Sequence, residues 1–294
     1  MCIRDRQETY LPAFTDAKKP AVAALALAEA GPLADPRTPA TTATRDGADL
    51  VITGEKALVP CADSAELFVI SVMLDGAARL VIVEAGTEGL TTSDEPAMGV
   101  RAAHTGRLHL DGVRVPAENL LGKADDTLDA IRRSRLAWAA LACGTGRAVL
   151  DQVRQYVVER KAFGEPIGHR QAVAFTVSNI AIELDGLRLV TLRAAARLDA
   201  GDDAGAAETI AHARALVGMH ATQIGSDAVQ LLGGHGFVKE FDNERWYRDL
   251  RGAGVLEGGV SVRPRRSAAP PALLLHIDRA LRRECLAYLR ARAK

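Results

Sequence analysis

The sequence predicts an α+β protein, in which an antiparallel β-barrel or sandwich is followed by a four-helix bundle. Short runs rich in β-branched residues, separated by turn signals, occupy residues 21–122. From about residue 125 onward, apolar residues recur every three or four positions instead. No helix-length segment separates the predicted strands, which argues against a βαβ sheet. With 294 residues, of which 48% are hydrophobic, the chain is long enough for two domains.

The strands are predicted from the runs DLVITGEKALV, ELFVISVML and ARLVIVEA. Turn signals accompany these runs at Arg45-Asp46-Gly47 and Leu74-Asp75-Gly76. The segment GRLHLDGVRVP alternates apolar and polar residues around Asp111-Gly112, a pattern that predicts a β-hairpin at this dipeptide. No GxGxxG motif follows a strand, so the usual dinucleotide-binding fold is excluded.

Three long apolar stripes predict three bundle helices. They cover residues 136–157, 173–198 and 210–231, and glycines at 164, 201, 233 and 234 separate them. A fourth helix is predicted over LLLHIDRALRRECLAYLRAR (273–292), after a Pro- and Ala-rich linker at 263–272. The bundle domain is therefore expected to span 123–294, after a β domain at 21–122.

Composition excludes several classes of function. The 37 basic and 37 acidic residues balance, which argues against nucleic acid as the main partner. Four dispersed cysteines form no CxxC pair, and no metal site is predicted, since His212 and His220 have no further ligand at suitable spacing. The sequence shows neither a membrane-spanning run nor a signal peptide, so a cytoplasmic protein without a membrane partner is expected.

Two motifs in the helical half carry a family resemblance. ERKAFGEPIGHRQ covers 159–171, and AVQLLGGHGF and ERWYRDLRGAGVLEGG lie within 228–259. In their order and spacing, the chain resembles the acyl-CoA dehydrogenase family from about Gln7 to at least Gly259. The resemblance implies FAD bound across a subunit interface, an acyl-CoA substrate, and an electron-transferring flavoprotein as partner.

The resemblance also implies the residues that bind FAD. Arg160 matches the position that pairs with the FAD pyrophosphate of the neighbouring subunit, and the planar fork of arginine suits a phosphate. Phe163 matches a position that packs on the adenosine half. The other implied cofactor-binding residues are Gln171, Gln230, Gly233 and Gly234.

Glu257 matches the catalytic base of the commonest branch of the family. In that branch the base removes a proton next to the thioester carbonyl while a hydride passes to the flavin, which gives a trans-2-enoyl-CoA. Such a proton is weakly acidic, so a desolvated carboxylate is expected. Another branch places its base near the start of the first bundle helix, where this chain has IRRSRLAW without an acid. Arg135 and Gly258 are the implied substrate-site residues.

The flavin-ring motifs depart from the family pattern. Where relatives carry T-E-P-x-x-G-S-D, this chain has AEAGPLAD (28–35), so alanines at 28 and 34 replace a threonine and a serine. After Lys56, Leu58 and Pro60 replace an aromatic residue and a hydroxyl residue, and Gly259 and Ser261 replace a threonine and a glutamine. These losses fit either a divergent active enzyme or a non-catalytic, half-site subunit. A homo-oligomer, either a dimer or a tetramer, or a hetero-oligomer with a sister subunit is therefore expected.

The N-terminal segment is expected to be a remnant of a larger helical domain. QETYLPAFTD (7–16) is similar to the last stretch of the family's N-terminal helical domain, so 1–20 is interpreted as its remnant. MCIRDR (1–6) fits neither pattern and is interpreted as an artefact. The missing helices would leave an apolar surface exposed, which indicates a truncated reading frame or an absent partner.

Overall fold

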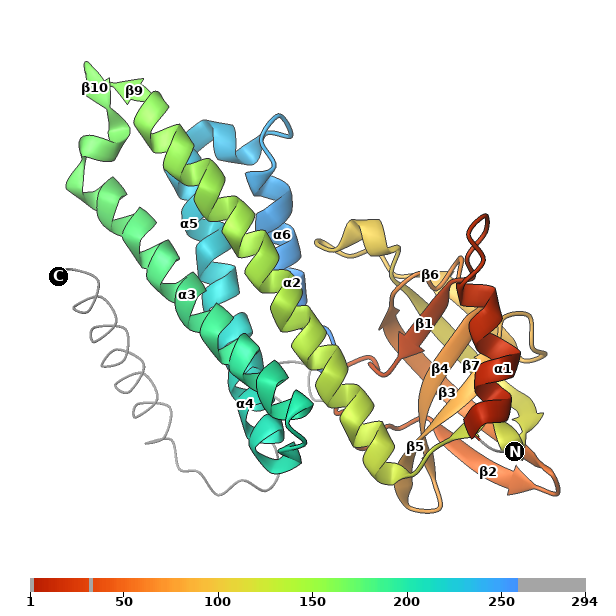
Figure 1. The fold of residues 1–294 in the computed structure, drawn as a ribbon. Coiled ribbons are helices and arrows are strands. Elements are labelled where there is room, and N and C mark those ends of the chain that lie inside the picture. The colour runs from red at the N-terminus through yellow and green to blue at the C-terminus, as the bar shows by residue number, and fades with distance from the viewer. Residues whose placement is uncertain (1–2, 32–33, 259–294) are drawn as a thin grey trace. The chain divides into compact units, whose positions relative to one another are not determined.

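The computed structural model describes residues 3–31 and 34–258 (Figure 1). These residues form two compact units, and the division between them falls within helix α2. The first unit contains residues 3–31, 34–135 and 255–258, and the second contains 136–254. The domain boundaries at 20 and 122 stay predictions.

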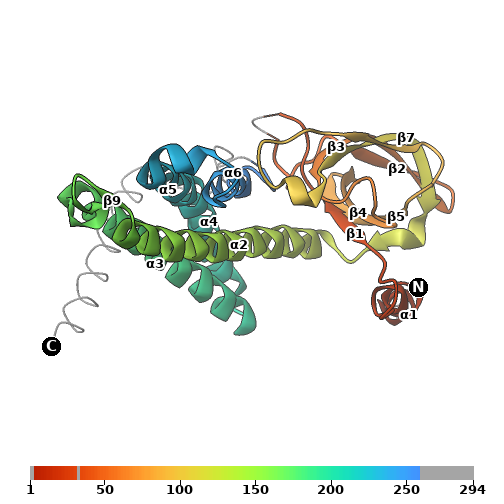
Figure 2. The same ribbon diagram turned by 90° about the horizontal axis from the view of Figure 1, so that it is seen from above.

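The first unit is mainly a sheet. After helix α1 (Ile3–Phe14), its strands are β1 (Ala23–Ala26), β2 (Thr42–Asp46), β3 (Asp49–Val59), β4 (Leu67–Leu74), β5 (Ala77–Glu84), β6 (Leu90–Asp94), β7 (Gly106–Pro116) and β8 (Leu120–Leu121). Short 3₁₀ turns lie at Arg101–Ala103 and Ala117–Asn119. The strand order is β6-β7-β3-β2-β4-β5-β8, with β1 paired to β4. Figure 2 shows these strands curling around a common interior.

The sheet is mixed, whereas the sequence predicted a purely antiparallel one. The pairs β2–β3, β3–β7, β4–β5, β5–β8 and β6–β7 are antiparallel, as expected. The pairs β1–β4 and β2–β4 are parallel. A tight turn forces antiparallel pairing on its two strands, but it says nothing about strands that meet from distant parts of the chain.

The predicted hairpin at Asp111-Gly112 is wrong, because β7 runs through it without a turn. Ile52 pairs with Val113 and Gly54 pairs with Leu110, so one residue of β3 faces two of β7. This is a β-bulge, and Gly112 takes a φ of +63° within it. By contrast, the turn at Asp75-Gly76 does join β4 to β5, with positive φ at both residues.

The interior of this sheet is apolar because alternate residues of its strands face it. Leu50, Ile52, Phe68, Ile70 and Val113 are almost fully buried in one cluster. Burial of each side chain of this size contributes about 1.5–3 kcal/mol. This packed interior gives the polar groups described below a fixed frame.

The second unit is helical. Its elements are α2 (Ala124–Glu159, from residue 136 on), β9 (Lys161–Ala162), β10 (Glu165–Pro166), α3 (Gln171–Asp199), α4 (Asp203–Leu216), a π-helical turn (Val217–Ala221), α5 (Thr222–Leu232) and α6 (Asn243–Ala253). Short 3₁₀ turns lie at Ile167–His169 and Gly233–Phe237. The stripe predicted over 210–231 runs through α4, the π turn and α5. The predicted helix at 273–292 and the linker at 263–272 lie outside the described residues.

Candidate active site

Glu257 follows helix α6 and belongs to the first unit. Although its side chain is ionisable, the residue is only 6% exposed. Its φ of +58° is uncommon for a residue other than glycine. The hydroxyl of Ser134 donates a hydrogen bond to its Oε1 at 2.9 Å. The chain therefore holds one carboxylate away from solvent, in a backbone conformation that needs support from its surroundings.

Arg135, the next residue along α2, supports the backbone of Glu257. Its Nε and Nη2 donate to the carbonyl oxygen of Glu257 at 3.2 and 2.9 Å. Burial and the nearby Arg37 lower the pKa of Arg135, while Asp35 and Glu257 raise it. An arginine nevertheless stays charged in proteins. The sequence predicted Arg135 to be a substrate residue. These two bonds show that its guanidinium group also contacts the main chain of Glu257, the predicted base.

Gly258 lets the same loop approach the segment around residue 35. Its φ is +92°, and a Cβ built on it would lie 3.2 Å from Cδ of Pro36 and 3.3 Å from the carbonyl oxygen of Ala34. A side chain here would strain the backbone and crowd both neighbours. The family resemblance made Gly258 a substrate residue, and the geometry adds this close approach.

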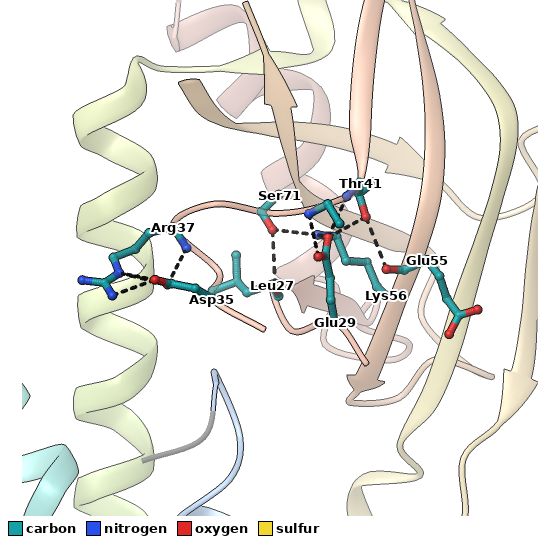
Figure 3. Close-up of polar contacts among 9 residues, drawn as sticks. Leu27, Glu29, Asp35, Arg37, Thr41, Glu55, Lys56 and Ser71 are labelled. Atoms are coloured by element: carbon teal, nitrogen blue, oxygen red, sulfur yellow. Dashed lines mark hydrogen bonds and ion pairs between the residues drawn. The ribbon is translucent and has the colours of Figure 1, made fainter. Parts of the chain in front are cut away.

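A buried ion pair lies in the same unit (Figure 3). Nζ of Lys56, which is fully buried, lies 2.7 Å from Oε1 of Glu29 and donates to Ser71 at 3.0 Å. Thr41 donates to the same Glu29 oxygen through its hydroxyl and its N–H, and the N–H of Ala40 donates to Oε2. These bonds join Glu29 and Thr41 to Lys56 on strand β3 and, through Lys56, to Ser71 on β4.

The two partners of this pair respond differently to burial. Burial acts to raise the pKa of Glu29, but the charge of Lys56 and the hydrogen bonds to Glu29 lower it overall. Burial lowers the pKa of Lys56, and Glu29 and Glu257 only partly oppose this. The desolvation of the Lys56 ammonium group is therefore only partly offset by nearby negative charge. The charge of Glu257 contributes to that offset.

Asp35 and Arg37 form a second ion pair (Figure 3), and the charge of Arg135 acts on Asp35. Nη2 of Arg37 lies 2.7 Å from Oδ2 of Asp35, and Nε bonds both carboxylate oxygens. Burial acts to raise the pKa of Asp35, but Arg37 and Arg135 lower it overall. The two ion pairs, Arg135 and Glu257 together carry three positive and three negative charges when all are ionised. This cluster is neutral only when Glu257 is a carboxylate.

Of the positions that depart from the family's flavin-ring motifs, Leu58 and Pro60 lie at the end of β3, Ala28 and Ala34 lie between β1 and β2, and Gly259 and Ser261 lie outside the described residues. Leu58 has a φ of +53°, and its N–H donates to Oε2 of Glu95 at 2.6 Å. The carbonyl oxygen of Ala28 accepts from the N–H of Ala57 at 3.0 Å. Pro60 has no N–H to donate. Ala28, Ala34 and Pro60 therefore offer no side-chain donor here.

In the second unit, the predicted cofactor residues lie around one end of α2. Arg160 directly follows this helix and is exposed. Phe163 is 95% exposed with a φ of +56°, and the guanidinium carbon of Arg170 lies 5.6 Å from its ring centroid. Gln171 is the first residue of α3 and is also exposed. Almost the whole surface of the Phe163 ring is therefore open to solvent.

The turn after α5 lies beside the same end of α2. The hydroxyl of Tyr156, one turn before Arg160, donates to the carbonyl oxygen of Leu232 at 3.3 Å and lies 2.9 Å from Nδ1 of His235. Gln230, near the end of α5, is exposed, as are Gly233 and Gly234 on the turn. Gly233 has φ +60° and ψ −133°, a conformation that is open essentially to glycine alone.

The comparisons with known proteins agree with this architecture. Residues 24–113 match the family described as acyl-CoA dehydrogenase, middle domain, and residues 125–268 match acyl-CoA dehydrogenase, C-terminal domain. The chain belongs to the acyl-CoA dehydrogenase family. The predicted family and the order of a β domain followed by a helical domain are therefore confirmed.

Individual acyl-CoA dehydrogenases have the same residue as this chain at about one aligned position in three. Isobutyryl-CoA dehydrogenase of Dictyostelium discoideum is 31% identical and short-chain specific acyl-CoA dehydrogenase of Bos taurus is 33% identical, each over 88% of this chain. The chain spans 64% of the length of both relatives. The structure of butyryl-CoA dehydrogenase from Megasphaera elsdenii matches with a TM-score of 0.76 and 26% identity, over 88% of this chain and 70% of that one.

Among the described residues, no group of three or more His, Cys, Asp or Glu side chains could hold a metal ion. None of the helices within 3–31 and 34–258 is long and apolar enough to cross a membrane.

Sequence reasoning missed Ser134 and the two ion pairs. The available signal for Ser134 was its place in IRRSRLAW, the stretch in which another family branch has its base.

Proposed function

We propose that this acyl-CoA dehydrogenase family member binds FAD and oxidises an acyl-CoA thioester to the trans-2-enoyl-CoA, with Glu257 as the base. The buried carboxylate of Glu257 is the observation that carries the proposal. Ser134 donates a hydrogen bond to its side chain, and Arg135 donates two to its main-chain carbonyl oxygen. A carboxylate held in this way is suited to accepting a proton from carbon.

The reaction divides between Glu257 and the cofactor. The Cα–H bond breaks, its proton forms an O–H bond on Glu257, and its electron pair becomes the new Cα–Cβ π bond. FAD, when bound, supplies the acceptor for the hydride that leaves Cβ. The thioester oxygen gains negative charge as the proton leaves, and the backbone N–H of Glu257 is the proposed donor that stabilises it.

The exposed residues around the end of α2 support the proposal that this chain contacts the FAD of a neighbouring subunit. Arg160 would pair with the pyrophosphate, and Phe163 would pack on the adenosine. Gln171, Gln230, Gly233 and Gly234 would lie against the same half, where exposed glycines allow backbone to approach closely. At the ring end, Ala28, Ala34 and Pro60 supply no hydroxyl, so Leu58 and backbone groups would have to hold the ring.

The relatives named above act, by their names, on isobutyryl-CoA, short-chain acyl-CoA and butyryl-CoA. Butyryl-CoA and isobutyryl-CoA are therefore the first substrates to test. We further propose an electron-transferring flavoprotein as acceptor, a homo- or hetero-oligomer, and a cytoplasmic location.

The test is to purify the protein, record its flavin absorbance and add acyl-CoA without oxygen. The proposal predicts a yellow protein whose flavin absorbance at about 450 nm falls when acyl-CoA is added. The loss of absorbance should be about proportional to the amount of bound flavin, and enoyl-CoA should form with it, because the reaction requires FAD in the site. A yellow protein that no acyl-CoA of any chain length bleaches would refute it.

A second candidate is a half-site subunit that lends Arg160 and Gln230 to the FAD of a partner. The absence of side-chain donors at Ala28, Ala34 and Pro60 favours it. Such a subunit would be colourless alone and would turn yellow only after a sister subunit is added. Flavin absorbance measured with and without that subunit separates the two candidates, and retention of the buried Glu257 favours the first.

A further inference from the structure

We propose that Ser134 is a positioning residue, which orients the carboxylate of Glu257 and favours its ionised form. This inference rests on the proposed role of Glu257 as base. Its starting observation is the 2.9 Å hydrogen bond from the Ser134 hydroxyl to Oε1 of Glu257.

The bond differs from those of five other serine and threonine hydroxyls on the described helices. Thr145, Thr176, Ser178, Thr191 and Thr209 each donate to the carbonyl oxygen four residues earlier in their own helix. This is the usual local bond of serine and threonine within helices. Ser134 instead donates to a residue 123 positions away in the sequence.

Ser134 and Arg135 act on different parts of the same residue. Ser134 bonds the side chain of Glu257, and Arg135 bonds its main-chain carbonyl. Because Glu257 has a positive φ, its local backbone preference does not hold it in place. Two adjacent residues of one long helix therefore determine both where the loop lies and where its carboxylate points.

The charged groups around Glu257 explain why an uncharged donor matters. Arg135 on α2 and Lys56 on β3 both interact with the charge of Glu257. Lys56 is already paired with Glu29, and the pair of Asp35 and Arg37 lies beside Arg135. A hydroxyl bond to the carboxylate favours its charged form without altering the balance of this cluster.

The test compares Ser134→Ala and Ser134→Thr with the control Ser178→Ala. The control makes the same chemical change at an exposed helix position that bonds only its own helix. Removing a hydrogen bond to a charged group is expected to slow flavin reduction about 10–100-fold near neutral pH. The acidic limb of the pH profile should move to higher pH in Ser134→Ala. Ser134→Thr keeps the hydroxyl and should retain most of the rate, while FAD and enoyl-CoA affinities stay unchanged.

A second readout separates this inference from the proposed function. Protein labelled with ¹³C at glutamate side-chain carboxyls is titrated by NMR without flavin, and the Glu257 signal is assigned with Glu257→Gln. The midpoint of that signal should rise in Ser134→Ala and stay as in the wild type in Ser178→Ala. If the wild type reduces no flavin but the midpoint rises, the proposed function fails and the positioning role stands. An unchanged midpoint in Ser134→Ala overturns the positioning role.

Discussion

Replacing Glu29 by glutamine would leave Lys56 buried without its counter-charge. The pair lies at 2.7 Å, with Lys56 fully buried and the Glu29 side chain only 11% exposed. Removing one partner of a buried ion pair destabilises a protein by about 3–5 kcal/mol. With roughly 3 °C per kcal/mol for domains of this size, the melting temperature should fall by about 10–15 °C. Thermal unfolding followed by circular dichroism measures the shift.

The matched control is Asp46→Asn, because Asp46 and Arg114 also pair at 2.7 Å but are both more than half exposed. Solvent screens such a pair, so this variant should melt close to the wild type. The double variant Glu29→Gln/Lys56→Met removes both buried charges and should recover most of the loss. Equal melting temperatures for Glu29→Gln and Asp46→Asn would refute the reasoning.

The pH dependence of this effect has a defined sign. The pKa of Glu29 in the folded chain lies below its ordinary value of 4.5. Its contribution to stability is therefore complete above about pH 4.5 and is lost as the pH falls through the lower, folded value. The difference between wild type and Glu29→Gln should accordingly narrow in acid.

Three further predictions concern the proposed site. Gly233→Ala should lower stability by about 1–3 kcal/mol in urea unfolding, since only glycine readily adopts its conformation; a melt like the wild type would contradict this. Phe163→Ala should leave stability unchanged because the ring is 95% exposed, but should weaken FAD binding about 5–100-fold through lost stacking; unaltered affinity in a fluorescence titration would exclude Phe163 from the site. Arg135→Lys cannot reproduce the two bonds to Glu257, so flavin reduction in stopped flow should slow about 10–100-fold with FAD retained; a rate like the wild type would show that the bonds are dispensable.

Local patterns in the sequence were sufficient for much of the fold. Alternation and turn residues predicted β2–β3 and β4–β5, whose strands are joined by short turns. The parallel pairs β1–β4 and β2–β4 join strands that are distant in the chain, and no local signal specifies them. At Gly112 the same glycine signal that favours a turn serves a bulge, so the local pattern alone was ambiguous.

The candidate site was predicted from motifs, but its supporting contacts were not. The motif around Glu257 led to the prediction of a desolvated base there, and the residue is buried in the structure. The bonds from Ser134 and Arg135 cross more than 120 residues of sequence, and the ion pair of Lys56 with Glu29 crosses 27. Such contacts depend on where the sheet places each strand, and periodicity does not encode them.

The most direct test of the central claim is single-turnover flavin reduction in Glu257→Gln. Glutamine is almost the same size as glutamate but cannot accept the proton as a carboxylate does. The account predicts that the variant binds FAD and enoyl-CoA like the wild type, while its reduction rate with butyryl-CoA falls by about 10²–10⁴. A variant that bleaches its flavin at the wild-type rate would show that another group removes the α-proton.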